Sequence, residues 1–253
     1  MPATSVEFAN VSFALADGRR LLDGVSLTLE AGTRTAVLGR SGSGKTTLLR
    51  MVNALLLPTG GEVRVGGVRT VDAISGGRMA AFRRKIGYVI QETGLFPHMT
   101  IARNAGLALE LAGRSESERV GRVAELLEMV GMPAGEFGWR YPWQVSGGQR
   151  QRVGLARALA SDPDVLLMDE PFGALDPVTR AEMQTMLWDL LRRMHKTVLL
   201  VTHDLDEAIY LADRVVFVEG GRLVAAMAAG EVMRSQEPAV LAYVAALRRG
   251  EVR

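Results

Sequence analysis

A glycine-rich stretch of eight residues, Gly39-Arg-Ser-Gly-Ser-Gly-Lys45-Thr46, constrains the fold of this chain more than any other sequence feature. It matches the pattern G-x-x-x-x-G-K-[ST], in which glycines let the backbone curl until successive N–H groups point at phosphate oxygens. The apolar run Thr35–Leu38 before it predicts a buried strand, and Lys45–Leu56 after it has helical composition. A strand, a glycine loop and a helix in this order predict an α/β fold that binds the phosphates of a nucleotide.

Two side chains of this loop have specific chemical roles in such a site. Lys45 can bridge the β- and γ-phosphates, and the Thr46 hydroxyl is placed to bind Mg²⁺. The residues that we expect to contact the nucleotide here are Gly39, Arg40, Ser41, Gly42, Ser43, Gly44, Lys45, Thr46 and Thr47.

Two carboxylates follow a second apolar run. Val165–Met168 predicts a buried strand, and Asp169 and Glu170 stand where the chain leaves it. Parallel sheets bind ligands at the carboxyl ends of their strands. In that setting Asp169 would hold Mg²⁺ and Glu170 would polarise the attacking water as general base. On its own an acidic turn after a strand is common, and the pattern gains its meaning from the phosphate-binding loop.

A third feature is the stretch Ser146-Gly-Gly-Gln149, which precedes the helical composition of Arg150–Ala160. Ser146 is a natural N-cap, and the glycines permit close approach of another backbone or a ligand. From the residues alone, a capped helix is the favoured interpretation.

The rest of the chain alternates strand and helix patterns. Short β segments come first, the stretch from Thr100 to Ala160 is mostly helical, and the final third returns to strands and helices. This order predicts a mostly parallel sheet with a helical insertion. At 253 residues, with 48% hydrophobic and 23% charged residues, the chain has an ordinary globular composition.

Composition limits the possible chemistry. Because cysteine is absent, the chain can form neither a disulfide nor a thiolate metal site. A formal net charge of +2 gives no argument for nucleic acid as a partner. Glu7 and Asn10 interrupt the N-terminal residues, so we expect no signal peptide, and no apolar run reaches the roughly 18–20 residues of a membrane span.

Taken together, these motifs resemble the ATP-binding cassette (ABC) family of ATPases over nearly the whole chain, and they occur in the family's order. The resemblance implies ATP and Mg²⁺ as cofactors. It also implies a P-loop α/β core with an N-terminal antiparallel β subdomain and an inserted α-helical subdomain. The matching elements are Gly39–Thr46 (Walker A), Gln91 (Q-loop), Val145–Gln149 (signature), Asp169-Glu170 (Walker B), Ala174-Leu-Asp176 (D-loop) and His203 (switch histidine).

The resemblance also implies roles for residues that the pattern alone leaves open. Gln91 would reach Mg²⁺ or the attacking water, and His203 would contact the γ-phosphate. The signature residues Ser146, Gly147, Gly148 and Gln149, with Asp176, would meet a nucleotide held by a second copy of the chain. The sequence departs from the family at Leu15, where an aromatic residue usually stacks on adenine; leucine offers apolar contact without a stacking face.

Within the family, the stretch from Ile86 to Ile101 and the surroundings of Tyr141-Pro142 are most similar to ATPase subunits of osmoprotectant importers. This implies uptake of a quaternary amine such as glycine betaine or choline. It also implies permease subunits as partners, a solute-binding protein as an indirect partner, and a peripheral place on the cytoplasmic face of the cell membrane. An importer for another small solute and, less favoured, a non-transport ABC ATPase are the alternatives; a kinase or GTPase is disfavoured by the signature and His203.

These similarities divide the chain into expected parts. We expect residues 1–95 and 158–230 to form the nucleotide-binding core, 96–157 the helical subdomain and 231–253 a helical tail. Leu95 and Phe96 would pack internally or meet a helix of the membrane partner. For Trp139, Tyr141 and Trp143 we favour packing within the helical subdomain over contact with a partner.

Overall fold

A computed structural model describes residues 3–91 and 93–250, the last five of these without their side chains. The chain separates into two compact units, which are described one at a time. The first comprises Met1–Arg83 with His195–Arg253, and the second comprises Arg84–Met194. The finer division into core, helical subdomain and tail stays a prediction.

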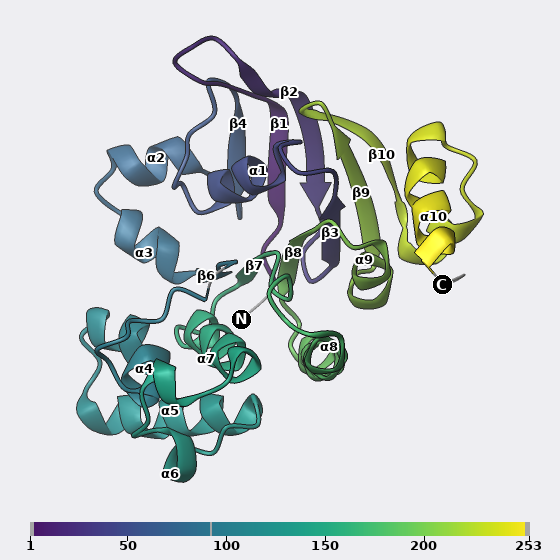
Figure 1. The fold of residues 1–253 in the computed structure, drawn as a ribbon. Coiled ribbons are helices and arrows are strands. Elements are labelled where there is room, and N and C mark those ends of the chain that lie inside the picture. Colours follow the sequence, from purple (N-terminus) through teal and green to yellow (C-terminus); the bar gives the residue numbers. More distant parts are fainter. Residues whose placement is uncertain (1–2, 92, 251–253) are drawn as a thin grey trace. The chain divides into compact units, whose positions relative to one another are not determined.

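The first unit contains an antiparallel sheet with strand order β2-β1-β4-β5 (Figure 1). Val6 and Phe8 of β1 point into the core by alternation, and Val11 is also buried after an irregularity of the strand between Phe8 and Val11. This confirms the predicted N-terminal antiparallel β subdomain. The strands are β1 (Val6–Ala14), β2 (Arg20–Leu29), β4 (Gly60–Val65) and β5 (Val68–Arg69).

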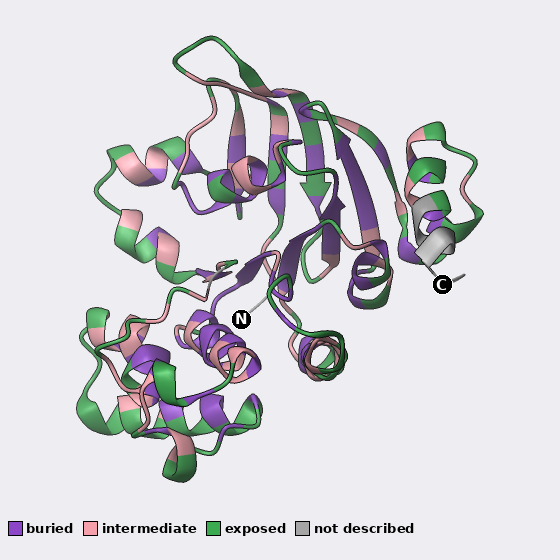
Figure 2. Cartoon of the chain, in the orientation of Figure 1, coloured by how far each residue is buried: buried purple, intermediate pink, exposed green. Residues whose placement is uncertain are grey.

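The same unit also carries the strands that position the glycine-rich loop. β3 (Arg34–Leu38) lies between β8 (Thr197–Thr202) and β9 (Arg214–Glu219) and pairs in parallel with both. All three are almost entirely buried (Figure 2), as expected of parallel strands covered on both faces. β10 (Arg222–Ala228) runs antiparallel to β9 and was not predicted from the sequence.

Helices complete the first unit. They include α1 (Lys45–Val52), α2 (Thr70–Ser75), α3 (Met79–Arg84), α9 (Leu205–Leu211), the 3₁₀ helix η2 (Ala229–Arg234) and α10 (Pro238–Gly250). α1 ends before Leu56 because Ala54 adopts a left-handed φ of 56°. No helix within the described ranges combines the length and the apolarity needed to cross a bilayer.

The second unit joins two parallel strands to a group of helices. β6 (Ile86–Val89) pairs with β7 (Val165–Asp169). Ile101, Leu126, Leu127 and Val153 are fully buried and form the helical core, which confirms the predicted helical insertion. The helices are α4 (Ile101–Leu111), α5 (Glu116–Met129), α6 (Ala134–Phe137), η1 (Pro142–Gln144), α7 (Gly147–Leu159) and α8 (Pro177–Arg193).

The aromatic residues before α7 differ from expectation. Trp139 and Trp143 are 63% and 69% exposed, so the predicted internal packing is wrong for both. Trp143 stacks on Tyr141 with ring centroids 5.7 Å apart, and the Arg140 guanidinium lies over the Trp139 ring. Trp143 therefore packs against Tyr141, and Trp139 against Arg140, at the surface and not in the core.

Candidate nucleotide-binding site

The glycine-rich loop connects the end of β3 to the start of α1 and is held by close backbone contacts. Gly44, the N-cap of α1, has a φ of 100°, which residues with a Cβ rarely adopt. A Cβ at this position would lie 2.6 Å from the Leu21 carbonyl oxygen and 2.7 Å from Leu22 Cδ2. A Cβ on Gly39 would lie 2.4 Å from the Val218 carbonyl oxygen. Both positions therefore require glycine.

Polar groups converge inside this loop. Lys45 is 5% exposed, and its ammonium donates to the carbonyl oxygens of Gly39 at 2.7 Å and Arg40 at 2.9 Å. The buried Ser43 hydroxyl has no hydrogen-bond partner. The first turn of α1, which begins at Lys45 and includes Thr46 and Thr47, contains no acidic residue. A cation, an unused hydroxyl and a helix N-terminus without its own anion suit a phosphate group.

His203 follows the strand next to the loop. β3 and β8 are parallel with Leu38 opposite Thr202, so Gly39 and His203 leave neighbouring strands at the same edge. The Asp204 carboxylate caps α9 by accepting hydrogen bonds from the N–H groups of Asp206 and Glu207. The backbone N–H of Asp204 donates to the Thr202 hydroxyl. These bonds fix the backbone on both sides of His203, whose side chain is exposed.

Leu15 lies in the turn between β1 and β2. Its N–H donates to the Arg19 carbonyl and its carbonyl accepts from Gly18, both at 2.9 Å. The side chain is half-buried, as is that of Phe13. The turn places an aliphatic surface at this position, and contact with a base stays a prediction.

In the second unit, Gln91 and Glu170 come together. β6 and β7 pair with Val89 opposite Met168, so both residues follow neighbouring parallel strands. The Gln91 amide Nε2 donates to Glu170 Oε2 at 3.3 Å. Glu170 has a φ of 44°, a left-handed conformation that costs about 1–2 kcal/mol for a residue other than glycine. Such strain is often found where a side chain must be aimed at a reacting group.

Asp169 is the last residue of β7 and is 3% exposed. The Tyr88 hydroxyl donates to its Oδ2 at 3.4 Å. Tyr88 was not among the site residues predicted from the sequence. Its position in β6, the strand parallel to the one that carries Asp169, is the signal that could have identified it once the pairing of β6 with β7 was assumed.

The stretch from Ser146 to Gln149 forms the capped helix start that its residues suggest. Ser146 Oγ accepts from the Gln149 N–H at 3.2 Å, and Gln149 Oε1 accepts from the Ser146 N–H at 2.9 Å. A Cβ on Gly148 would lie 2.5 Å from Thr179 Cγ2, so this glycine lets α7 approach α8 closely. Ser146, the N-cap residue at the start of α7, is exposed.

Asp176 is the N-cap of α8 and accepts a hydrogen bond from the Thr179 N–H at 3.1 Å. Hydrogen bonds from Thr179 lower the pKa of the Asp176 carboxyl. Capping accounts for an aspartate at this position, and its contact with a second subunit stays a prediction.

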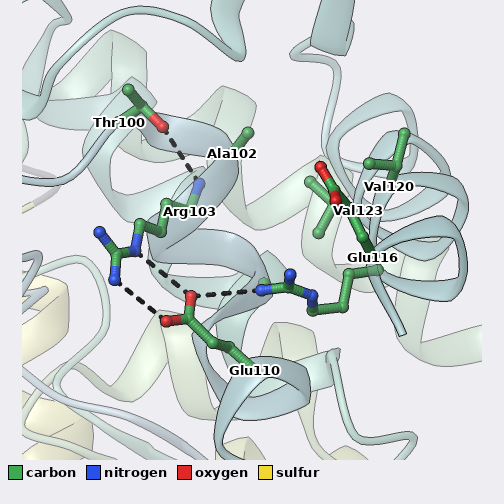
Figure 3. Close-up of a pocket in the computed structure, with 9 residues that line it drawn as sticks. Thr100, Ala102, Arg103, Glu110, Glu116, Val120 and Val123 are labelled. Carbon is green, nitrogen blue, oxygen red and sulfur yellow. Dashed lines mark hydrogen bonds and ion pairs between the residues drawn. The ribbon is translucent and has the colours of Figure 1, made fainter. Parts of the chain in front are cut away.

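A pocket of about 400 Å³ lies between α4 and α5 in the same unit (Figure 3). One wall is apolar, formed by Val120 and Val123. The other carries Glu110, which forms ion pairs with Arg103 at 3.0 Å and Arg119 at 3.4 Å. The hydrogen bond from Arg103 lowers the pKa of the Glu110 carboxyl. Val120 is 64% exposed, so the pocket has an accessible apolar rim.

Comparison with known proteins agrees with this geometry. The profile of the ABC transporter family matches residues 22–173. The structure of the dimeric ATP-binding cassette MJ0796 bound to ADP and Pi is similar, with a TM-score of 0.78 and 34% identity. The similarity covers 88% of this chain and 98% of that one.

Curated relatives are more similar in sequence. The choline transport ATP-binding protein OpuBA of Bacillus subtilis is 44% identical over 89% of this chain and 58% of its own length. The glycine betaine uptake system ATP-binding protein YehX of Escherichia coli is 42% identical over 87% of this chain and 69% of its own length. The methionine import ATP-binding protein MetN of Cereibacter sphaeroides is 46% identical over 81% of this chain and 57% of its own length.

The chain thus spans little more than half the length of most of these relatives. The α/β fold, with its P-loop core, antiparallel sheet and helical insertion, is that of the ABC ATPases. By its matched profile and by its similarity to these proteins, the chain belongs to the ABC transporter family.

Proposed function

We propose that this chain is the ATP-binding and ATP-hydrolysing subunit of an ABC importer that takes up a quaternary-amine osmoprotectant such as glycine betaine or choline. The hydrogen bond of 3.3 Å between Gln91 and Glu170 carries the proposal of hydrolysis. A phosphate-binding loop alone predicts nucleotide binding, whereas a carboxylate held in place by a neutral amide can also activate water.

In this proposal the loop in the first unit binds the phosphates. The backbone N–H groups of residues 39–44 and the N-terminus of α1 face the negative charge. Lys45 exchanges the carbonyl oxygens of Gly39 and Arg40 for phosphate oxygens, and the Ser43 hydroxyl gains the partner that it lacks. His203 contacts the γ-phosphate from the neighbouring strand.

Glu170 acts as general base. Its carboxylate accepts a proton from water as the water oxygen attacks the γ-phosphorus, and the bond to the β-phosphate oxygen of ADP breaks. Gln91 holds Glu170 and the water in position and does not titrate. The left-handed backbone of Glu170 fixes the direction of this side chain.

The family implies Mg²⁺, and the residues present fit it. Asp169 offers a buried carboxylate, and Thr46 and Gln91 offer neutral oxygens, the hard ligands that Mg²⁺ prefers. In the part of the chain that the structure describes, no cluster of three or more His, Asp or Glu side chains could hold a metal. Phosphate and water would therefore supply the other ligands. When bound, Mg²⁺ would neutralise negative charge on the phosphates.

A second copy of the chain completes the site in this proposal. The tip of α7 offers N–H groups and a helix N-terminus, and its first turn contains no acidic residue. These groups suit the γ-phosphate of a nucleotide bound by another subunit, with Asp176 near the contact. The solved structure of MJ0796 is a dimer bound to ADP and Pi, which supports such pairing.

The membrane partner would be a permease, with a solute-binding protein as indirect partner, and the chain would lie on the cytoplasmic face of the cell membrane. Phe96 is 41% exposed after the Gln91 loop, and the pocket between α4 and α5 offers Val120 beside a charged wall. Both features support the docking of a permease helix on the second unit.

The names of the relatives OpuBA and YehX support choline or glycine betaine as the solute. The relative MetN, 46% identical, makes methionine or another small solute the second candidate. The chain would be copurified with the permease encoded beside it, and ATPase activity would be measured with a solute-binding protein and each solute. Stimulation by choline or glycine betaine is expected; stimulation by methionine alone would support the second candidate, and stimulation by neither would contradict both.

A further inference from the structure

Arg157, in the last turn of α7, makes two hydrogen bonds to one short backbone segment. Its Nη1 donates to the Gly94 carbonyl at 2.7 Å and its Nη2 to the Thr93 carbonyl at 2.5 Å. The guanidinium is half-buried, and burial lowers its pKa. Both acceptors lie just beyond Gln91, although they are 63 and 64 residues away from Arg157 in the sequence.

The backbone that Arg157 holds is unusual. Thr93 and Gly94 both have left-handed φ angles, 54° and 51°. For the β-branched Thr93 this conformation is a genuine outlier that neighbouring contacts must maintain. The Thr93 N–H donates to the Ile90 carbonyl within its own turn at 3.1 Å. The two bonds from Arg157 are thus the long-range polar contacts that keep these two carbonyls aimed at α7.

Two further residues of α7 contact the same segment. Gln151 Nε2 donates to the Gln91 carbonyl at 3.5 Å, and a Cβ on Gly154 would lie 3.9–4.0 Å from Thr93. Gln151, Gly154 and Arg157 are spaced by three residues and lie on one face of the helix, here named the clamp face. Gln151 is 4% exposed and its Oε1 has no hydrogen-bond partner, so the bond to Gln91 is made by a largely buried amide.

We infer that Arg157 is a positioning residue for hydrolysis, because it fixes Thr93 and Gly94, which lie close to Gln91 in the chain, to the helix whose first turn carries the signature glycines. This inference rests on the proposed function. Gln91 in turn donates to Glu170, so the clamp face acts on the general base through Gln91. α7 then carries the signature glycines in its first turn and, through Gln151 and Arg157, holds Gln91 and the residues that follow it.

A matched control lies on the same helix. Arg152 is also half-buried and also donates to a backbone carbonyl, that of Val130 at 2.9 Å. It lies five positions from Arg157, about 140° around the helix, so it faces away from the Gln91 segment. R157A and R152A therefore remove the same side chain from the same helix, but only R157A releases the segment.

The test combines hydrogen exchange with kinetics on the full chain. In R157A the amides of residues 93–96 are expected to exchange about tenfold faster, the change that corresponds to about 1.4 kcal/mol. Its kcat should fall about tenfold while the Kd for ATP stays within about twofold. R152A should leave the exchange rates and kcat unchanged. R157K keeps the positive charge but loses the two-donor geometry of the guanidinium, so its exchange rates and kcat should be intermediate.

Three outcomes would overturn the inference. Residues 93–96 could stay protected in R157A, R152A could expose them equally, or kcat could stay at the parent value after protection is lost. A parent chain that binds ATP without hydrolysing it in complex with its permease would instead overturn the proposed function. The exchange data would then still decide whether Arg157 holds the segment.

Discussion

The phosphate-binding loop in the first unit and the Gln91–Gly94 segment in the second differ in what determines their shape. The shape of the loop depends on its own glycines, because neighbouring backbone leaves no room for a Cβ at Gly39 or Gly44. The Gln91 segment is shaped by side chains of α7 that lie about sixty positions away, Gln151 and Arg157. A local motif therefore explains the shape of the first region, whereas only the folded chain shows the contacts that shape the second.

The largest expected effect tests the chemistry of the second region. E170Q removes the charge of the proposed base but keeps an oxygen that can accept from Gln91 Nε2, so the geometry is preserved. Loss of general base catalysis should lower turnover about 10²- to 10⁴-fold. Steady-state phosphate release measures turnover, and equilibrium binding of ATP provides the control. Turnover near the parent value would exclude Glu170 as the base.

A smaller effect tests the first region. In G44A the new Cβ would meet the Leu21 carbonyl oxygen at 2.6 Å, so the loop must shift. The affinity for ATP should fall about a hundredfold, equivalent to about 2.8 kcal/mol. G42A is the matched control, because Gly42 has a φ of 78° but nothing within 4 Å of a new Cβ.

In both variants an alanine must adopt a left-handed backbone conformation, which costs about 1–2 kcal/mol. Only in G44A does the new Cβ also clash with the Leu21 carbonyl oxygen. Isothermal titration gives the affinities and thermal unfolding gives the stabilities. Equal losses of affinity in G44A and G42A would mean that backbone strain, and not contact with Leu21, makes glycine necessary in this loop.

Much of the fold could be predicted because apolar runs mark buried strands. Thr35–Leu38 and Val165–Met168 lie within β3 and β7 as predicted. β10 was missed because its apolar residues 223–228 do not alternate with polar ones, so the sequence lacks the pattern of a half-buried strand, and in the structure Ala225 is its one buried residue. Trp139 and Trp143 look like core residues by type alone, and only the structure shows that both are exposed, Trp143 against Tyr141 and Trp139 against Arg140.

The site could be predicted as far as its residue types. Lys45, Asp169 and Glu170 follow directly from motifs at strand ends. The left-handed backbone of Glu170, the hydroxyl of Tyr88 near Asp169 and the clamp face depend on which strands and helices become neighbours. Spacing along the chain does not contain that information, because each contact joins residues far apart in sequence.

The smallest expected effect concerns Leu15, a half-buried residue in the turn after β1. If this turn meets the base, L15Y adds an aromatic face worth about 0.5–1.5 kcal/mol, and the affinity for ATP should rise about two- to tenfold. Inorganic tripolyphosphate, which has no base, should bind L15Y and the parent chain equally. L15M should behave like the parent, because methionine keeps apolar contact without a ring. An equal gain for tripolyphosphate would show that position 15 acts on the phosphate-binding loop and not on the base.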